Sequence, residues 1–266
     1  MSISRTGLLT CLAIDFGVQT VGFLHAVAFK TEKFYDFCGS GTFLTLAIYS
    51  YVSGTAKGDR ALISSTLASV WAVRLGAFLF TRVLMVGKDR RFDEVKEDWK
   101  KFGVFWFGQA MWCFTVMLPV LLLNYTGNKA GPLGTLDYVG IGIWGLGFFT
   151  ETVADAQKAY FKYKNPDVSH WIDSGLWAYS RHPNYFGEIT LWIGNYLLCW
   201  NGLSAAMRGV AVLSPVFITS LLLFGSGIPI LERQADARWG HLPDYQQYKR
   251  RVSVLVPLPW PCDKEL

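Results

Sequence analysis

The stretch Gly175-Leu-Trp-Ala-Tyr-Ser-Arg-His-Pro-Asn-Tyr-Phe-Gly-Glu188 concentrates polar side chains in a chain that is otherwise mostly apolar. Arg181 presents a planar guanidinium suited to phosphate or carboxylate, and His182 titrates near neutral pH. Asn184 both donates and accepts hydrogen bonds, and Glu188 accepts them when ionised. A long apolar run begins directly after this stretch. The pattern predicts a polar mouth at the end of a membrane helix.

The composition favours a multi-pass membrane protein. Of the 266 residues, 52% are hydrophobic and only 17% are charged, whereas soluble domains carry roughly 25% charged residues. The five cysteines are scattered without a C-x-x-C pair, so neither a zinc site nor a disulfide framework is indicated. We therefore predict an all-α integral membrane bundle that forms a single membrane domain over residues 1–266.

About seven apolar segments are predicted to cross the bilayer. Their approximate bounds are residues 7–29, 37–54, 61–87, 102–124, 133–154, 186–200 and 204–231. In the first segment Asp15 and Gln19 lie four residues apart, so they share a helix face that we expect to turn inward. The fifth segment continues into a polar helical extension from Glu151 to Lys164. The N-terminus lacks the cleavage site of a signal peptide, so we expect it to form the first span.

Lysine and arginine are distributed unevenly between the two sides that seven spans define. Of the 25 residues, eighteen fall on one side and five on the other, while Arg74 and Arg82 lie within the third segment. By the positive-inside rule the side with eighteen is cytosolic. The predicted topology places the N-terminus in the lumen or outside. It places residues 175–188, the 88–101 loop and the C-terminal tail in the cytosol. Residues Asp263–Leu266 are in the wrong order and on the wrong side for a lumenal retention signal.

The run Gly140-Ile-Gly-Ile-Trp-Gly145 matches a dinucleotide fingerprint letter by letter. That fingerprint requires a strand before it and a helix after it, whereas these glycines lie inside an apolar span. Close helix packing is therefore the expected role of these glycines.

Two further groups of polar residues have two interpretations each. Glu151, Asp155, Lys158 and Lys162 follow helical spacing, either as a solvated face or as a wall facing the Arg181 stretch. The tail from residue 232 onward is rich in tyrosine and basic residues. It is predicted to lie on anionic lipid, to close over a nucleotide as a cytosolic lid, or both.

The 175–188 stretch resembles the signature of the steroid 5-alpha-reductase-like membrane proteins. The runs Glu151-Thr-Val-Ala-Asp-Ala-Gln-Lys158, Trp71-Ala-Val-Arg-Leu-Gly76 and Gly87-Lys-Asp-Arg-Arg-Phe92 also resemble that group, so the similarity extends from about residue 60 to the end. The resemblance implies a seven-helix membrane bundle with a lumenal N-terminus. It also implies NADPH-dependent reduction of an activated carbon–carbon double bond in a lipid.

The resemblance implies that residues 151–266 form a C-terminal cofactor-binding half. The positions that match cofactor-contacting residues of the steroid and sterol reductases are Asp155, Lys162, Tyr179, Asn184 and Glu188. Lys158, Arg181 and His182 match the sterol-reductase version of the motif, and the spacing from Tyr248 to Pro257 also resembles those reductases, so these residues are included in the predicted cofactor site. The neighbouring positions that we add to the predicted cofactor site are Glu151, Tyr185 and Tyr245.

The catalytic residues of the resembling enzymes match this sequence less well than their cofactor-binding residues do. Steroid reductases carry a catalytic tyrosine three residues before the arginine that Arg74 resembles, and here that position is Trp71, which has no acidic hydroxyl. Asp36 is a candidate for the partner carboxylate of those enzymes, and Tyr49 is a second candidate for the catalytic acid. Tyr35 and Tyr51 are further candidates for that acid.

The sequence predicts an NADPH-dependent reductase with a hydrophobic lipid substrate in the bilayer, and with neither nucleic acid nor metal as a partner. The expected location is the endoplasmic reticulum if the source is eukaryotic. One alternative is an S-adenosylmethionine-dependent methyltransferase of the isoprenylcysteine type. Those enzymes share the Arg-His-Pro-x-Tyr-x-Gly core but generally lack the Asp-x-Gln-Lys run seen at 155–158. The other alternative is a non-catalytic binding protein that retains the cofactor cavity but has lost the catalytic acid. The tryptophan at position 71 supports this alternative.

Overall fold

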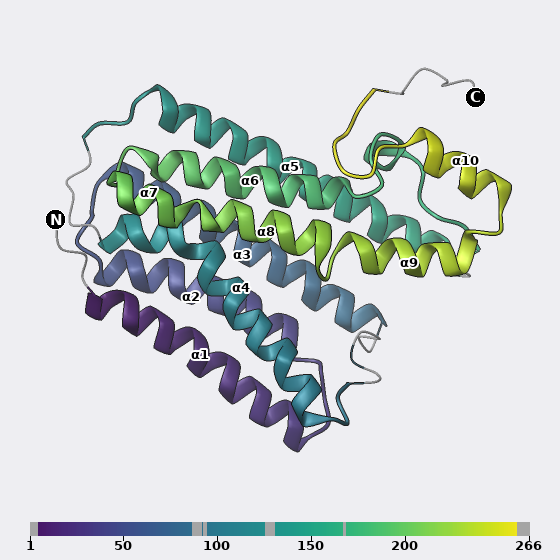
Figure 1. Cartoon of the computed structure of the whole chain (residues 1–266), viewed down its shortest axis with the longest axis horizontal. Coiled ribbons are helices and arrows are strands. Elements are labelled where there is room, and N and C mark those ends of the chain that lie inside the picture. The colour runs from purple at the N-terminus through teal and green to yellow at the C-terminus, as the bar shows by residue number, and fades with distance from the viewer. Residues whose placement is uncertain (1–4, 87–91, 93–94, 126–130, 167–168, 260–266) are drawn as a thin grey trace. The chain divides into compact units, whose positions relative to one another are not determined.

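The computed structural model describes residues 5–86, 92, 95–125, 131–166 and 169–259 (Figure 1). Within these residues the chain is all helical, as predicted, and its only strand-like pairing is an isolated bridge between Ser180 and Ser253. The helices are α1 (Arg5–Ala28), α2 (Tyr35–Ser53), α3 (Asp59–Val86), α4 (Trp99–Tyr125), α5 (Thr135–Lys164), the short 3-10 helix η2 (Gly175–Ala178), α6 (Pro183–Trp200), α7 (Ala205–Ala211), α8 (Leu213–Phe224), α9 (Ile228–Trp239) and α10 (Pro243–Arg251).

Six of the seven predicted segments each correspond to one helix, and the polar extension to Lys164 is part of α5. The predicted segment 204–231 lies in an apolar helical region, Ala205–Trp239, that is divided into α7, α8 and α9. Residues 225–227, Gly-Ser-Gly, separate α8 from α9, and Pro229 stands in the first turn of α9. Glycine weakens a helix through its backbone freedom, and proline is accommodated in the first turn, so the sequence favours a break here.

Four helical regions of the described chain are long and apolar enough to cross a membrane, judged by length and composition. They are Thr6–Ala28, Asp59–Arg82, Trp99–Tyr125 and Ala205–Trp239. The other predicted spans and the orientation of the termini remain predictions.

The chain divides into two compact units, which we describe separately. Unit 1 comprises residues 1–140 and 195–217, and unit 2 comprises residues 141–194 and 218–266. The predicted cofactor-binding half, 151–266, therefore contributes residues 195–217 to unit 1 and its other residues to unit 2. In unit 1, α1, α2 and α4 pack against one another in pairs, and α3 runs along α2 (Figure 1).

A polar seam joins α1, α2 and α4 inside unit 1. Asp15 and Gln19 are 0% and 3% exposed, so the prediction that their shared face turns inward is confirmed. The Gln19 amide donates to Thr42 Oγ1 at 3.1 Å, and the Gln109 amide donates to Gln19 Oε1 at 2.9 Å. Because buried amides must find partners, these bonds favour one register between the three helices.

A second polar contact in unit 1 joins the start of α3 to the start of α5. Arg60 Nε and Nη2 donate to the two carboxylate oxygens of Asp137 at 2.6 and 2.7 Å, and both side chains are almost fully buried. The backbone N–H of Gly134 donates to Asp137 Oδ2 at 2.8 Å. A bidentate pair with this geometry orients both helix ends.

The crossing of α5 and α6 in unit 2 depends on two glycines. A Cβ atom on Gly187 would lie 2.5 Å from Glu151 N and 2.6 Å from Gly147 O, and one on Gly147 would lie 2.4 Å from Leu191 N. Side chains larger than hydrogen therefore do not fit between these backbones.

The fingerprint-like glycines 140–145 lie within the α5 helix, so they lack the strand-to-helix context of a dinucleotide site. Their predicted packing role was wrong for two of them. No described atom lies within 4 Å of a Cβ built on Gly142 or Gly145, and the close contact is made by Gly147 instead.

Candidate functional site

The site is built on the segment between α5 and α6, which α5 holds in place. Gly175 has a backbone φ of +61°, and a Cβ there would meet the Gln157 amide at 2.4 Å, so the turn requires glycine. Gln157 Oε1 accepts a bond from Leu176 N at 3.0 Å, and the Trp177 indole N–H donates to Ala154 O at 3.0 Å. Lys158 Nζ lies 4.5 Å from the centre of the Trp177 ring.

Glu232, near the start of α9, connects three basic side chains. Its carboxylate lies 3.3 Å from Arg181 Nη2, 3.0 Å from His182 Nε2 and 3.1 Å from Lys249 Nζ. Glu232 was not among the predicted site residues. The sequence signal that could have identified Glu232 is its position directly after an apolar run, because a charged side chain at such a position needs a partner.

The C-terminal tail folds onto the 175–182 segment. Tyr248 donates its hydroxyl to Trp177 O at 2.9 Å, and Arg181 Nη1 donates to Lys249 O at 3.0 Å. Ser180 Oγ donates to Leu255 O at 2.7 Å, next to the bridge with Ser253. The tail is thus a structural part of the site as well as a basic segment.

The helical row on α5 divides into two halves. Glu151 and Asp155 are 3% and 6% exposed, and Asn184 on α6 donates to Asp155 Oδ1 at 3.1 Å. Lys158 is half-buried over Trp177, whereas Lys162 is exposed. The acidic half therefore faces the α6 side of the site, and the row becomes solvated toward its basic end.

The predicted tyrosines occupy different surroundings. The Tyr185 ring stacks on His182, with centroids 5.6 Å apart and planes 9° from parallel. Tyr179 is 43% exposed. Tyr245 is 3% exposed and packs against Trp171 with ring centroids 5.0 Å apart, so it supports the tail from inside. Burial raises the pKa of Tyr248, which keeps its hydroxyl protonated as the donor to Trp177 O.

Arg181 and His182 each carry a buried nitrogen that has no hydrogen-bond partner among the described residues, Nε and Nδ1 respectively. Burial lowers the pKa of His182 below its usual 6.5, although the bond to Glu232 opposes that shift. The ring is therefore neutral at pH 7. Because a carboxylate accepts, His182 Nε2–H donates to Glu232 and leaves Nδ1 as an acceptor. A donor and an acceptor that lack protein partners thus belong to adjacent residues.

Comparison with known families identifies the group. Residues 22–252 match the profile of a family described as "Protein of unknown function (DUF1295)". The chain belongs to this family. The DUF1295 family is the steroid 5-alpha-reductase-like group, so the predicted family is confirmed.

One curated relative is similar over part of the chain. It is the Delta(14)-sterol reductase ERG24A of Gibberella zeae, with 27% identity over 154 residues. The matched region spans 52% of this DUF1295 chain and 30% of the length of that reductase. No solved structure matches the chain.

The candidates for the catalytic acid lie in unit 1 and are not brought together. Asp36 forms an ion pair with Arg82, with 2.6 Å between Asp36 Oδ2 and Arg82 Nη2. Tyr49 lies 13 residues further along α2, about 20 Å at 1.5 Å per residue. Tyr35 donates its hydroxyl to Phe105 O at 2.9 Å. Trp71 is fully buried, with its ring centroid 4.9 Å from that of Phe43.

Some predicted features lie outside the described residues. These are the motif residues 87–91, Cys262 and the terminal residues Asp263–Leu266. In the part of the chain that is described, no three His, Cys, Asp or Glu side chains are grouped so as to hold a metal ion.

The lowered pKa of His182 predicts a pH dependence. Unfolding frees the imidazole to bind a proton near pH 6.5, so His182 stabilises the fold above that value and ceases to do so as the pH falls below it. Between pH of about 7.5 and about 5.5, the melting temperature of the wild type should fall more than that of His182→Gln. The measurement is a thermal melt in detergent at both pH values. Equal slopes for the two proteins would contradict the assignment of a neutral, buried His182.

Proposed function

We propose that this chain is an NADPH-dependent membrane reductase that acts on an activated carbon–carbon double bond in a sterol-like lipid. Family membership and the partial similarity to a protein named as a sterol reductase support the reaction class. The observation that carries the cofactor assignment is the adjacent pair of buried, unpaired nitrogens, Arg181 Nε and His182 Nδ1. A buried polar atom without a partner costs free energy, which a bound ligand removes.

The side chains of the site fit the groups of a nicotinamide nucleotide. Arg181 Nε donates to a phosphate oxygen, and Lys158 and Lys162 supply further positive charge for phosphates. His182 Nδ1 accepts from a ribose hydroxyl or an amide N–H. Asn184 and Glu188 orient the nicotinamide end. When bound, the reduced nicotinamide supplies a hydride to the β carbon of an enone-like group.

The contacts around these groups keep the site in one arrangement before a ligand arrives. Glu232 fixes the positions of the Arg181 guanidinium and the His182 ring, and it selects the tautomer of His182. Asp155 holds the Asn184 amide. Preorganised groups lower the entropy lost on binding and exclude water from the reacting atoms.

The proposed membrane arrangement has seven spans, a lumenal N-terminus and a cytosolic unit 2 site, in the endoplasmic reticulum if the source is eukaryotic. The excess of lysine and arginine on one side supports this orientation. A glycosylation tag at residue 259 that becomes modified would place that end in the lumen and contradict the orientation.

Ligand binding to the purified protein tests the proposed cofactor. NADPH should raise the melting temperature, and Lys162→Ala should weaken NADPH affinity about tenfold, because a charge-assisted phosphate contact is lost. Lys162 is exposed, so the variant keeps its fold. Arg233→Ala is the matched control, since Arg233 is also exposed and donates to Pro229 O within its own helix.

The outcome also separates the alternatives. Stabilisation by S-adenosylmethionine but not by NADPH would reject the reductase in favour of a methyltransferase. NADPH binding without turnover of any enone lipid would indicate a binding protein, for which the buried Trp71 is the relevant observation.

A further inference from the structure

Asp15 of α1 is a buried carboxylate without a partner in the part of the chain that is described. Its side chain is 0% exposed, and neither Oδ1 nor Oδ2 has a hydrogen-bond partner among those residues. It lies inside Thr6–Ala28, a helical region that is long and apolar enough to cross a membrane. A buried carboxylate in such a region costs free energy unless a positive charge or a proton neutralises it.

The basic side chains of α1, α2 and α4 lie far from Asp15 along their helices. On α1, Arg5 and His25 are each ten residues away, about 15 Å along the axis. Helix α2 contains neither lysine nor arginine. The two lysines of α4 stand in its first turn, at least about 18 Å along the axis from Cys113, whose thiol interacts electrostatically with Asp15. Within the described residues of these three helices, no basic side chain is placed to neutralise Asp15.

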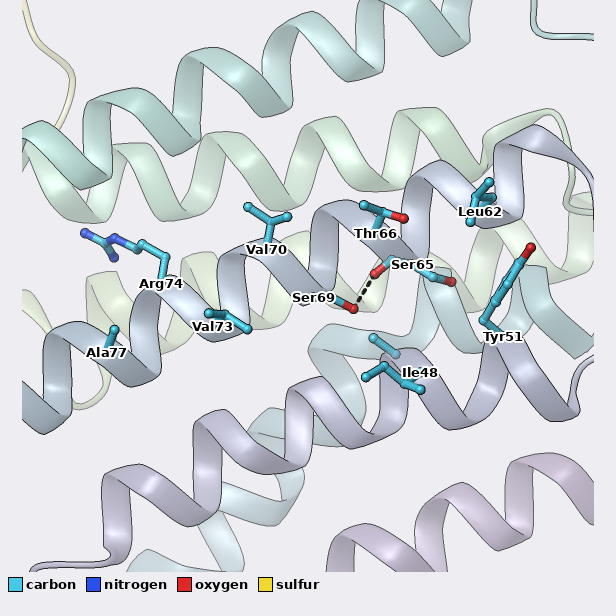
Figure 2. A pocket seen from close by; sticks show the side chains of 11 residues that line it. Ile48, Tyr51, Leu62, Ser65, Thr66, Ser69, Val70, Val73, Arg74 and Ala77 are labelled. Carbon is cyan, nitrogen blue, oxygen red and sulfur yellow. Dashed lines mark hydrogen bonds between the residues drawn. The ribbon is translucent and has the colours of Figure 1, made fainter.

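The arginine in the middle of α3 is on the other side of α2. Thr42 of α2 faces α1, because its hydroxyl accepts from Gln19. Tyr51 comes nine residues later, about two and a half turns at about 3.6 residues per turn, so it stands on the opposite side of α2. There it lines a groove between α2 and α3 together with Arg74 (Figure 2). Arg74 therefore belongs to a different face of unit 1 from Asp15.

Two neutral oxygens with unused acceptor capacity belong to the same polar seam as Asp15. Gln19 stands one turn from Asp15 on the same face of α1, and its Oε1 accepts one bond, from the Gln109 amide at 2.9 Å. Thr42 Oγ1 accepts one bond from the Gln19 amide at 3.1 Å and donates to Cys38 O at 2.7 Å. An amide or hydroxyl oxygen has two lone pairs, so each of these oxygens has room for one more contact.

This set of oxygens favours a monovalent alkali cation over other metal ions. One carboxylate balances the charge of a monovalent ion, whereas Ca²⁺ and Mg²⁺ usually take more carboxylate or phosphate oxygens. Softer metal ions prefer thiolate and imidazole ligands, and the neighbouring Cys113 is a thiol that donates to Gly39 O at 3.6 Å.

The spacing of the oxygens favours a cation over a proton on Asp15. A protonated carboxyl group needs an acceptor for its O–H, and no described residue offers one within hydrogen-bond distance of either oxygen. Oxygens that share a cation lie farther apart than a hydrogen bond, because the ion stands between them. An unpaired carboxylate beside two unsaturated oxygens fits that arrangement.

We propose that unit 1 binds a monovalent alkali cation between α1 and α2, with Asp15 as the charged ligand and Gln19 Oε1 and Thr42 Oγ1 as neutral ligands. The ion neutralises a carboxylate that no side chain neutralises. It also joins α1 to α2 next to the bond that holds Gln109 of α4, so it stabilises the packing of all three helices. The site does not depend on the proposed reductase function.

Melting temperatures at constant ionic strength test the site. The full chain is purified in detergent with choline chloride, which is then replaced stepwise by NaCl or by KCl. At least one alkali salt should raise the melting temperature of the wild type along a saturating curve. Asp15→Asn keeps the size of the side chain without its charge, so its melting temperature should not respond. Asp59→Asn, an exposed carboxylate at the start of α3, is the matched control and should respond like the wild type.

Direct binding of radiolabelled Na⁺, or of Rb⁺ in place of K⁺, tests the ligands one by one. The wild type should bind one ion per chain and Asp15→Asn none. Thr42→Val keeps the shape of the side chain but removes its oxygen, and it should weaken ion affinity about tenfold. In choline chloride Asp15→Asn should melt no lower than the wild type, which shows that the variant folds.

Two results would overturn the proposal. A wild type that melts alike in choline, sodium and potassium chloride has no alkali site, and its Asp15 is protonated. An Asp15→Asn protein that still binds one ion per chain places the ion elsewhere.

Discussion

Glu232→Gln is expected to destabilise unit 2 and to release its C-terminal tail. The substitution leaves Arg181, His182 and Lys249 without their shared anion while keeping the size of the side chain. Breaking a fully buried ion pair costs about 3–5 kcal/mol, and the partial exposure of this cluster reduces the expected loss to about 2–3 kcal/mol. The measurements are the melting temperature in detergent and the rate of trypsin cleavage after Lys249, Arg250 and Arg251.

The matched control for this prediction is Asp236→Asn on the same helix. Asp236 contacts Lys249 at 2.6 Å, and its side chain is 48% exposed, so its loss should change stability by less than about 1 kcal/mol. Faster cleavage is expected for Glu232→Gln but not for Asp236→Asn. If both variants melt and cleave alike, Glu232 does not organise the site.

Gly187→Ala is expected to force α5 and α6 apart. Its Cβ would lie 2.5 Å from Glu151 N and 2.6 Å from Gly147 O, and both are backbone atoms that cannot rotate away. Overpacking of this kind costs about 1–3 kcal/mol or more. Separation of the helices would also lengthen the 3.1 Å bond between Asn184 and Asp155, so NADPH affinity, if the proposed function holds, should fall with stability.

Gly145→Ala provides the control on α5, since no described atom lies within 4 Å of its Cβ. Replacing glycine by alanine in an open helical position stabilises by about 0.5–1 kcal/mol. The two variants should therefore shift the melting temperature in opposite directions. A Gly187→Ala protein at least as stable as Gly145→Ala would show that the helices do not cross as closely as described.

The helices were the predictable part of this fold, because long apolar segments and i, i+4 spacing are local properties of the sequence. The inward face of Asp15 and Gln19 follows from spacing alone. The breaks between α7, α8 and α9 were missed because the whole segment is strongly hydrophobic. The Gly-Ser-Gly run at 225–227 was the local signal for the break between α8 and α9.

The site was predictable only in part, for a different reason. The residues of 151–188 could be selected because their chemistry is concentrated in a short region. Glu232 could not be paired from the sequence, since it lies 50 residues after His182 and no local pattern links the two. Asp36 and Tyr49 were chosen from residue type, and helical geometry separates them along α2.

The bond between Ser180 and Leu255 spans 75 residues, which has a consequence for biosynthesis. At about 5–20 residues per second, translation needs about 4–15 s to travel from one partner to the other. Arg181 and His182 therefore leave the ribosome well before the segments that complete their surroundings. During that interval these two basic side chains lack their permanent contacts, and they are open to other anionic groups or to chaperones.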